Sequence, residues 1–479
     1  MPQPFPPQDP DAFNDARITV MGLGNFGGGA GVTRWLCDQG ATVLLTDTEP
    51  PEKLKAAIAS IQDLIDSNQV TLRLGEHNIS DFTTPDLVVA NPAVPKPWEN
   101  RFLRATHAAG IPITTEIRLL VERLPPDAPT LGITGSAGKS TTSAMIAHAL
   151  RSISPSPTVH FGGNIGGSLL PALASMSPTD FIILELSSAM LYWLGKDVGY
   201  SGAGAWSPRV AILTNLQENH TDWHGSFEHY ADSKFNIFAN QSPPAIAIVG
   251  QSSAEIEHRF GRLNRKPHQL GSSESERTLS DLGDMNELAN LQIPGAHNVL
   301  NARLALLALA LGVRVFPRLL EGPQSFLQAA RALQTFPGLP HRLQFAAERG
   351  GIRYFNDSKS TTPASCLLAV AAFDDKPGRN KVHLIVGGYD KKSDLTPVAQ
   401  LAPQLAGLYT IGTTGPIIAS LSRGENIHQC VTLSAAMERM RERARAGDIV
   451  LLSPACASWD QFTNYEARGD QFCELAKAP

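Results

Sequence analysis

A glycine-rich loop lies between an apolar strand and a helix in TLGITGSAGKSTT, residues 130–142. Gly135 and Gly138 allow backbone N–H groups to turn inward around phosphate oxygens, and the helix N-terminus adds the positive end of its dipole. In such a loop Lys139 reaches the β- and γ-phosphates, and the Ser140 hydroxyl ligates magnesium. We therefore predict that these residues and Thr141 bind a nucleotide.

The loop departs from the full phosphate-loop pattern, because Ile133 stands where that pattern has its first glycine. A glycine turn that only caps a helix is the alternative. The guanine signature N-K-x-D is absent, since Asn380-Lys381 continues with Val-His, and this favours ATP over GTP. Glu185 ends the apolar strand of FIILELSS, where an acid beside a phosphate loop can hold magnesium or can be a solvated strand-end acid.

A segment rich in histidine and acid follows the next apolar strand, in QENHTDWHGSFEHYADSKFNIF. Its residues His220, Asp222, His224 and His229 are of the types that bind zinc, but no second ligand-rich segment completes such a site. A polar surface loop is the competing interpretation.

The opening strand RITVMGLG leads into a second glycine pattern, Gly22-x-Gly24-x-x-Gly27, and Asp47 follows twenty residues after Gly27 at the end of the next strand. This spacing is close to a dinucleotide fingerprint, and NAD or FAD, another nucleotide, or a tight turn without a ligand all fit it. A chain with both glycine loops uses two nucleotides, or holds a nucleotide-linked substrate in one of them.

Short apolar runs alternate with helical patterns along the chain, which predicts three successive α/β units with parallel sheets. Proline-containing breaks in ERLPPDAPT and TFPGLPHR place the expected domains at 1–127, 128–338 and 339–479. We expect residues 1–14, which are rich in proline, to form a flexible leader, and we assign no elements to residues 251–291. Open α/β sheets bind ligands at the carboxyl ends of their strands, so the loops quoted above are the expected sites.

The composition excludes several classes of protein. The 479 residues carry a net charge of −5 with both signs scattered, unlike a nucleic-acid binder. The longest apolar run, LALLALALGV, is about half a membrane span, which predicts no membrane segment. Five widely spaced cysteines without a C-x-x-C pair indicate neither a disulfide framework nor a zinc cluster, and favour the cytoplasm.

Both glycine loops, together with NDSKSTTP, GGYDKK and the closing LLSPACASWDQFTNYEARGDQF, resemble the Mur ligase family over nearly the whole chain in order. These are ATP-dependent amide-bond ligases that build the peptidoglycan precursor. The closing motifs resemble its D-glutamate-adding members, and the D-N-P-R motif of the diaminopimelate- or lysine-adding members is absent. The resemblance implies Rossmann-like first and third domains, a central ATP-binding domain, and addition of D-glutamate to UDP-N-acetylmuramoyl-L-alanine by a cytoplasmic monomer.

The resemblance also implies residue roles. The UDP-sugar would contact Gly24, Asn25, Asp47, Thr48 and Asn164. One magnesium ion would bind Ser140 and Glu185, and a second would bind His220 and Lys234, with Lys234 carbamylated. Lys139, Glu185, His220 and Lys234 would be the catalytic residues. Further nucleotide contacts would come from Asn298, Asn301, His341, Arg342 and Asp357. D-Glutamate would contact Thr361, Lys391, Ser458 and Tyr465.

Such a set suits the implied reaction, in which ATP converts a carboxylate into an acyl phosphate that the amine of D-glutamate attacks. Alternatives remain: Asn298 and Asn301 could flank a helix, and Tyr465 could belong to the core. Three positions depart from the family pattern, namely Ala137, Asn219 and Glu49, and the segment GKDVGYSGAGAWSPR is longer than expected. Two rival functions are a folylpolyglutamate synthetase and a nucleotide-gated binding protein without chemistry.

Overall fold

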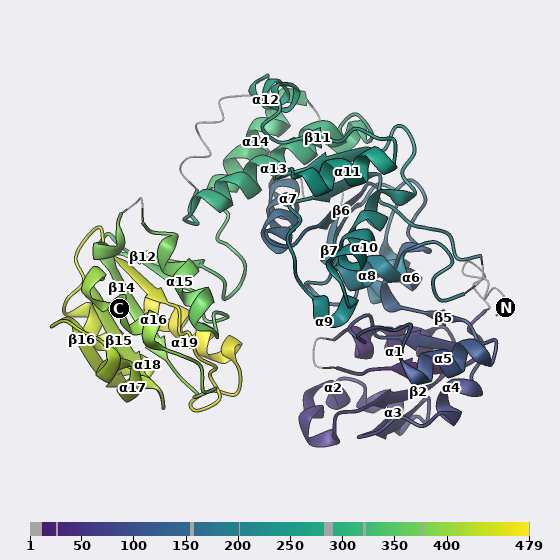
Figure 1. Ribbon diagram of the computed structural model, residues 1–479, viewed down its shortest axis with the longest axis horizontal. Coiled ribbons are helices and arrows are strands. Elements are labelled where there is room, and N and C mark those ends of the chain that lie inside the picture. The colour runs from purple at the N-terminus through teal and green to yellow at the C-terminus, as the bar shows by residue number, and fades with distance from the viewer. Residues whose placement is uncertain are drawn as a thin grey trace. The chain divides into compact units, whose positions relative to one another are not determined.

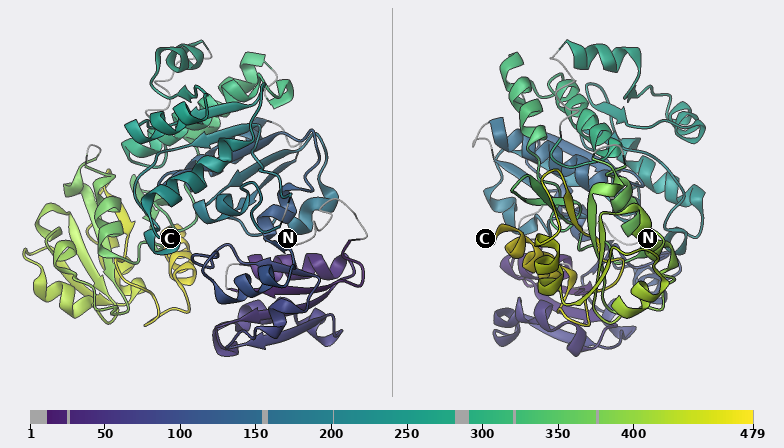
Figure 2. Two further views of the ribbon diagram at one scale, coloured as in Figure 1. Left: turned by 45° about the vertical axis from the view of Figure 1, so that its right-hand side comes forward. Right: turned by 90° about the vertical axis from the view of Figure 1, so that its left-hand side faces the viewer.

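The computed structural model describes residues 12–24, 27–153, 158–200, 202–281, 291–319, 322–374 and 377–478. The chain forms two compact units, Met1–Met285 with Asn301–Ala330 and Asn286–Leu300 with Arg331–Pro479. The first unit contains two parallel sheets and the second contains one mixed sheet (Figures 1 and 2). The predicted α/β class is confirmed.

The N-terminal sheet has the strand order β3-β2-β1-β4-β5, and every pair in it is parallel. The order reverses between β1 and β4, so the crevice at their carboxyl ends is the expected ligand position. Its strands are β1 Arg17–Met21, β2 Thr42–Asp47, β3 Val70–Leu74, β4 Leu87–Ala90 and β5 Ile113–Thr114. Its helices are α1 Gly28–Asp38, α2 Lys55–Ala59, α3 Gln62–Asp66, α4 Ser80–Thr83, α5 Arg101–Ala108 and α6 Glu116–Val121.

The predicted flexible leader is wrong at its C-terminal end. Phe13 is buried in the core of the first unit and its ring meets Trp35 edge-on at 5.2 Å. The Arg123 guanidinium lies 5.0 Å from the centre of the same ring. A proline-rich composition favours an extended chain, but burial of one large aromatic side chain outweighs that preference locally. Residues 1–11 lie outside the described residues.

The central sheet has the order β11-β10-β9-β6-β8-β7 and is parallel throughout. Strands β6, β8 and β9 are buried along their whole length because helices cover both faces, as their uninterrupted apolar sequences predict. The strands are β6 Thr130–Thr134, β7 Val159–Gly163, β8 Phe181–Glu185, β9 Val210–Leu213, β10 Ile246–Val249 and β11 His268–Gln269. The helices are α7 Lys139–Ile153, α8 Ser188–Trp193, α9 Thr221–His224, α10 Phe227–Ala239, α11 Ala254–Arg262, α12 Ser273–Ser280, α13 Ala296–Gly312 and α14 Gly322–Gln334.

Residues 251–291, to which the sequence assigned no elements, contain α11, β11 and α12 within their described part. The second half of helix α13 is apolar on all sides, and the structure buries most of it accordingly. Among the described residues, no helix combines the length and the hydrophobicity needed to cross a membrane.

One buried arginine of the N-terminal region forms hydrogen bonds with the long segment after α8. Arg118, on α6, donates from Nε to Trp193 O at 2.7 Å, from Nη2 to Gly195 O at 2.7 Å and from Nη1 to Gly204 O at 3.0 Å. The Tyr200 hydroxyl in the same segment donates to Glu122 Oε1 at 2.6 Å. The described residues of this segment, 195–200 and 202–209, therefore join the two sheets of the first unit.

We expect Arg118→Met to loosen this junction, because it leaves buried carbonyl oxygens without donors, at a cost on the order of 3 kcal/mol. Differential scanning calorimetry should show a lower melting temperature, and limited proteolysis should show new cleavage within residues 195–209. Arg104→Met, at an exposed position on α5, is the matched control. Wild-type melting and protease resistance in Arg118→Met would contradict this role.

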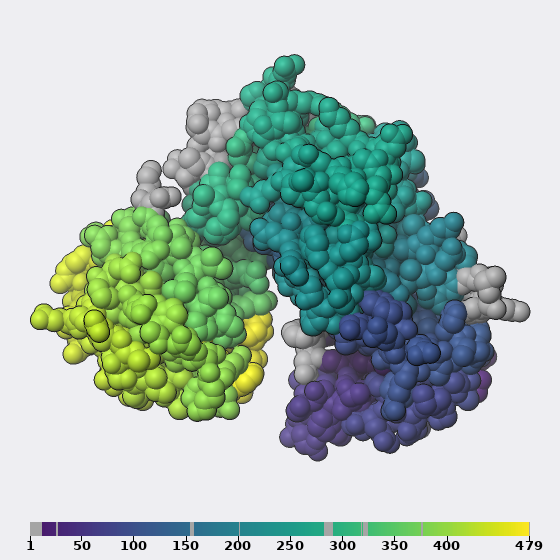
Figure 3. Space-filling model, viewed as in Figure 1, coloured from purple at the N-terminus to yellow at the C-terminus, as the bar shows by residue number. Residues whose placement is uncertain are grey.

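The C-terminal sheet has the order β12-β13-β17-β14-β15-β16, with only the β12–β13 pair antiparallel. Figure 3 shows the surface of this unit, coloured from green to yellow along the chain. The strands are β12 Gln344–Arg349, β13 Ile352–Asn356, β14 Val382–Gly387, β15 Gly407–Ile411, β16 Ile427–Val431 and β17 Ile449–Leu452. The helices are α15 Pro363–Ala371, α16 Thr396–Ala399, α17 Gly415–Leu421, α18 Leu433–Arg441 and α19 Tyr465–Lys477.

Candidate nucleotide and amino-acid sites

The predicted phosphate loop joins β6 to α7 at the centre of the central sheet. Gly135 and Gly138 have φ angles of 148° and 82°, in the region that favours glycine. A Cβ at Gly135 would lie 1.9 Å from Thr214 Oγ1, and one at Gly138 would lie 2.7 Å from Asn301 Oδ1. At both positions a side chain would collide with these atoms, and the backbone conformation also favours glycine. Ser140 and Thr141 lie in the first turn of α7, at the positive end of its dipole.

Polar residues after β9 hold this loop in place. Thr214 Oγ1 donates to Ala137 O at 2.5 Å, and the Ala137 N–H donates to Asn215 Oδ1 at 3.0 Å. The Ser136 hydroxyl donates to Gln217 O at 2.9 Å. Sequence reasoning did not assign these contacts, although the polar residues at the end of RVAILTNL mark the strand that neighbours β6.

Two lysines converge on the same carbonyl oxygen of the loop. Lys139 Nζ and Lys234 Nζ each donate to Gly135 O at 2.9 Å. Lys234 is 1% exposed, and its Nζ lies 4.7 Å from the centre of the Tyr230 ring. Burial, and then the charge of Lys139, lower the pKa of Lys234 well below its ordinary value.

Tyr230 was not among the predicted residues, yet it connects both parts of this site. Its hydroxyl lies 2.8 Å from Ser136 Oγ in the loop, and its ring faces Lys234. The spacing Tyr230-x-x-x-Lys234 in a helix was the signal for it, because residues four apart share a face.

Glu185 lies at the carboxyl end of β8, next to the strand that carries the phosphate loop. Its Oε1 accepts a hydrogen bond of 2.9 Å from Asn164 Nδ2, which brings a predicted UDP-sugar residue to a predicted magnesium ligand. Its Oε2 is buried and has no hydrogen-bond partner among the described residues. An unpartnered buried carboxylate oxygen is costly, so this oxygen is chemically suited to accept a cation.

His220 lies at the N-cap of α9 in a left-handed backbone conformation, and its side chain is exposed. Burial of part of the ring, and then the charge of Lys234, lower the pKa of His220. His224 and His229 instead pair with each other, at 2.9 Å between their Nδ1 atoms, and His224 Nε2 lies 2.9 Å from Ser188 Oγ. Within the described residues, no group of three or more His, Cys, Asp or Glu side chains could hold a metal ion, so the zinc alternative gains no support.

The two predicted adenine residues lie one turn apart on α13. Asn301 contacts the loop at Gly138 and lies 3.4 Å from the Thr142 hydroxyl, both belonging to the first unit. Asn298 is buried, and its Nδ2 donates to Pro294 O at 2.6 Å. Asn301 therefore does more than flank a helix, because its side chain leaves no room for a Cβ at position 138.

The opening glycine loop is tied to Asp47 at the end of β2. The Gly24 N–H donates to Asp47 Oδ2 at 3.0 Å and the Glu49 N–H donates to Asp47 Oδ1 at 2.9 Å. Thr48 is exposed beside it, and Asn25 lies outside the described residues. A Cβ at Gly22 would lie 3.0 Å from Asn91, so the ends of β1 and β4 meet closely at the point where the strand order reverses.

In the second unit, Asp357 lies at the carboxyl end of β13 and is 3% exposed. It accepts hydrogen bonds from the Leu343 N–H at 3.1 Å and from the Ser453 hydroxyl at 2.7 Å. Burial raises the pKa of Asp357 to about 6 despite these bonds. His341 is buried beside it, with Nδ1 at 3.1 Å from Asn356 Nδ2, whereas Arg342 is exposed.

The raised pKa of Asp357 predicts that this residue lowers the stability of the fold by an amount that depends on pH. Because the pKa rises from 3.8 to about 6 on folding, ionised Asp357 destabilises the fold progressively from about pH 4 to pH 6. Above that window the cost is constant, on the order of 3 kcal/mol.

We therefore expect Asp357→Asn to melt at a higher temperature than the wild type at about pH 8, and this advantage should shrink as the pH falls below about 6. Calorimetry across this pH range measures it, with Glu438→Gln, at an exposed carboxylate on α18 of the same unit, as the control. An advantage that does not change with pH would contradict the shift.

The predicted D-glutamate residues lie at the carboxyl ends of strands in the third sheet. Thr361 and Lys391 line one small pocket together with Tyr389, Thr414 and Cys456. Lys391 Nζ lies 5.0 Å from the centre of the exposed Trp459 ring. Ser458 is buried, and its hydroxyl has no hydrogen-bond partner among the described residues.

Tyr465 is half-buried at the start of α19, where its ring meets His341 edge-on at 5.8 Å. Arg468, one turn later, is 1% exposed and was not predicted. It donates to Ser358 O at 2.8 Å, to Cys456 O at 3.1 Å and to Ala457 O at 3.2 Å. Arg468 thus holds the loops after β13 and β17 together.

The family was established by comparison with known proteins. The Mur ligase middle domain matches residues 133–309, and the glutamate ligase domain of Mur ligases matches residues 341–456. A UDP-N-acetylmuramoylalanine–D-glutamate ligase of Roseiflexus sp. (strain RS-1) is 33% identical, covering 96% of this chain and 98% of that protein. The chain belongs to the Mur ligase family.

A second curated ligase and a solved structure are also similar to this chain. A UDP-N-acetylmuramoylalanine–D-glutamate ligase of Anaeromyxobacter dehalogenans (strain 2CP-C) is 34% identical, covering 96% of this chain and 97% of that protein. A crystal structure of the Thermotoga maritima MurF ligase in complex with ADP is 14% identical, covers 97% of this chain and 94% of that chain, and has a TM-score of 0.48.

The structure accommodates the three departures from the Mur ligase pattern locally. Ala137 needs no larger side chain for its contacts, because its backbone forms hydrogen bonds with the side chains of Thr214 and Asn215. Asn219 Oδ1 accepts a hydrogen bond of 2.9 Å from the His220 N–H. Glu49 forms an ion pair of 2.6 Å with Lys53, which offsets its charge near Asp47.

Proposed function

We propose that this Mur ligase adds D-glutamate to UDP-N-acetylmuramoyl-L-alanine, with hydrolysis of ATP to ADP and phosphate. The observation that carries the proposal is the match over 96% of the chain to relatives named for that reaction. The phosphate loop, with Lys139, Lys234 and Glu185 around it, supports the use of ATP. The orphaned Ser458 hydroxyl supports an amino-acid site in the second unit.

The residues around the phosphate loop fit magnesium. The unpartnered Glu185 Oε2 is an anionic oxygen ready for a cation, and Ser140 supplies a hydroxyl from the first turn of α7. We propose Ser140 and Glu185 for one ion, and His220 with carbamylated Lys234 for a second. Magnesium is often bound by one or two protein groups together with phosphates and water, so a preformed cluster is unnecessary. When bound, it neutralises the charge that develops on the phosphates.

In the proposed reaction, a carboxylate oxygen of the UDP-substrate attacks the γ-phosphorus, and ADP leaves. The amine of D-glutamate then attacks the acyl carbon of the acyl phosphate, phosphate leaves, and the nitrogen loses a proton to form the amide. Lys139 offsets the repulsion between the carboxylate and the γ-phosphate. Tyr230 holds Ser136 and Lys234 in the positions they require.

Substrate contacts follow the predicted residues. We propose that Gly24, Asn25, Asp47, Thr48 and Asn164 hold the UDP-sugar, and that Asn298, Asn301, His341, Arg342 and Asp357 contact the nucleotide. Thr361, Lys391, Ser458 and Tyr465 would hold D-glutamate. We also propose the domain limits 1–127, 128–338 and 339–479, a monomer, and a cytoplasmic location, in keeping with five free cysteines.

A phosphate-release assay tests the function. Purified protein with ATP and Mg²⁺ is offered UDP-N-acetylmuramoyl-L-alanine and related UDP-muramoyl precursors, each crossed with D- and L-amino acids. We expect release only with the L-alanine precursor and D-glutamate together. Release when one of the two substrates is left out, or equal release with L-glutamate in place of D-glutamate, would overturn the proposal. A folylpolyglutamate synthetase would instead respond to a folate and L-glutamate.

A further inference from the structure

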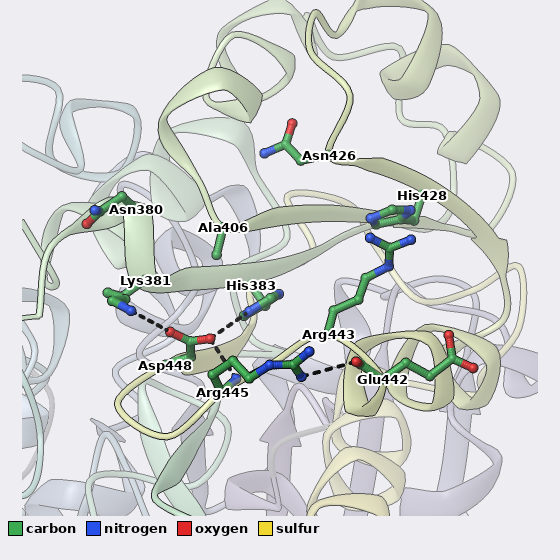
Figure 4. A pocket seen from close by; sticks show the side chains of 10 residues that line it. All are labelled: Asn380, Lys381, His383, Ala406, Asn426, His428, Glu442, Arg443, Arg445 and Asp448. Carbon is green, nitrogen blue, oxygen red and sulfur yellow. Dashed lines mark hydrogen bonds and ion pairs between the residues drawn. The ribbon is translucent and has the colours of Figure 1, made fainter.

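The C-terminal unit contains a cavity of about 590 Å³ at the edge of the sheet opposite the predicted ligand residues (Figure 4). It is lined by residues at the amino ends of four strands and by the loop after α18: Asn380, Lys381, His383, Ala406, Asn426, His428, Glu442, Arg443, Arg445 and Asp448. Thr361, Lys391 and Ser458 instead follow the carboxyl ends of β13, β14 and β17. The cavity is therefore separate from the proposed amino-acid site.

Its one buried acid is already neutralised. Asp448 is 5% exposed and accepts a hydrogen bond of 2.8 Å from the Arg445 N–H. Its other neighbours are Lys381 Nζ at 3.4 Å and His383 Nε2 at 3.3 Å. Burial opposes ionisation of this carboxyl, but these hydrogen bonds lower the pKa of Asp448 overall. The negative charge of Asp448 is therefore balanced by groups that belong to the wall of the cavity.

The side chains of Arg443 and Arg445 have N–H groups that remain available to donate hydrogen bonds to a ligand. The Arg443 guanidinium forms no hydrogen bond or ion pair within the described part of the chain, and in Figure 4 it points toward the His428 ring. Arg445 Nη1 donates only to the backbone oxygens of Glu442 and Ala444, at 3.2 Å and 3.1 Å. The Glu442 carboxylate extends away from Arg443 and lies 3.8 Å from Arg439.

Two histidines, His383 and His428, line the same cavity. Burial, followed by the charges of Arg443, Arg439 and the neighbouring His383, lowers the pKa of His428. His383 is held between Asp448 and the Tyr409 hydroxyl, at 3.1 Å from the latter. Both rings are neutral near pH 7 and present N–H donors or nitrogen acceptors at fixed positions.

We propose that this cavity binds a small phosphorylated molecule, with its phosphate on Arg443 and Arg445. Guanidinium groups match phosphate oxygens in a bidentate geometry, and the Asn380 amide can contact the remainder of the ligand. The cavity is much larger than one phosphate and lies in the usual range for small-molecule sites, about 300–1,000 Å³. The proposal does not depend on the proposed function.

Isothermal titration calorimetry with glucose 6-phosphate tests the site, using full-length protein saturated with ADP and Mg²⁺ so that the phosphate loop is filled. We expect saturable binding at concentrations up to about 10 mM, no binding of glucose, and weaker binding as salt is raised. Arg443→Gln should weaken binding about tenfold. Arg349→Gln, at an exposed position on β12, should bind as the wild type does.

Proton NMR of His428 gives a readout that needs no variant. A bound phosphate should raise the pKa of His428, and glucose should leave it unchanged. Absence of saturable binding, equal binding by Arg443→Gln, or a His428 pKa that glucose 6-phosphate does not move would each overturn the proposal.

Discussion

Replacement of Lys139 by alanine is expected to lower the rate of ligation by about 10³-fold, because the loop loses a cation at the transferring phosphate. Binding of the UDP-substrate should be unchanged, since the loop after β1 and the loop after β6 belong to different sheets. Lys139 donates to backbone oxygens of its own loop, at 2.9 Å to Gly135 O and 3.3 Å to Ser136 O. We expect the fold to survive the loss of these bonds, because they join residues of one loop.

Initial-rate assays measure the ligation, and calorimetry without ATP measures binding of the UDP-substrate. Lys266→Ala, at an exposed position between α11 and β11, is the matched control. Equal loss of ligation and of UDP-substrate binding in Lys139→Ala would show that the two sites are not separate.

Replacement of Lys234 by alanine is expected to reduce ligation by about 10²-fold or more, with partial rescue by acetate. Lys234 is buried and its pKa is lowered well below the ordinary value by burial, so its amine is neutral enough to react with CO₂. The nitrogen lone pair forms a bond to the CO₂ carbon, one C–O π bond breaks, and the nitrogen loses a proton to water. The product is an anionic N-carboxylate, which can bind magnesium, whereas a protonated amine would repel it.

Lys234→Arg separates the carbamate from a simple need for a cation, because a guanidinium remains protonated and cannot be carbamylated. We expect Lys234→Arg to be as inactive as Lys234→Ala, and ¹³CO₂-treated wild-type protein to show a carbamate signal that both variants lack. Lys266→Ala again controls for loss of one lysine. Retention of most activity in Lys234→Arg would refute the carbamate.

Local sequence determined the parts of this protein in which neighbouring residues act together. The phosphate loop could be predicted because Gly135, Gly138, Lys139 and Ser140 are consecutive or nearly so, and their conformations follow from the lack of a Cβ and from a helix start. The strands of the central sheet could be predicted because a sheet covered on both faces requires uninterrupted apolar runs. Longer motifs identified the family, as the comparisons confirmed.

Tertiary structure decided the contacts between residues far apart in the chain. Thr214 fixes Ala137 across 77 residues, Arg118 holds Gly204 across 86, and Arg468 joins Ser358 across 110. No periodicity encodes such pairs, because they depend on which strands become neighbours in the sheet. For the same reason the burial that lowers the pKa of Lys234, the orphaned oxygen of Glu185 and the basic cavity at the amino ends of four strands became visible only once the chain was folded.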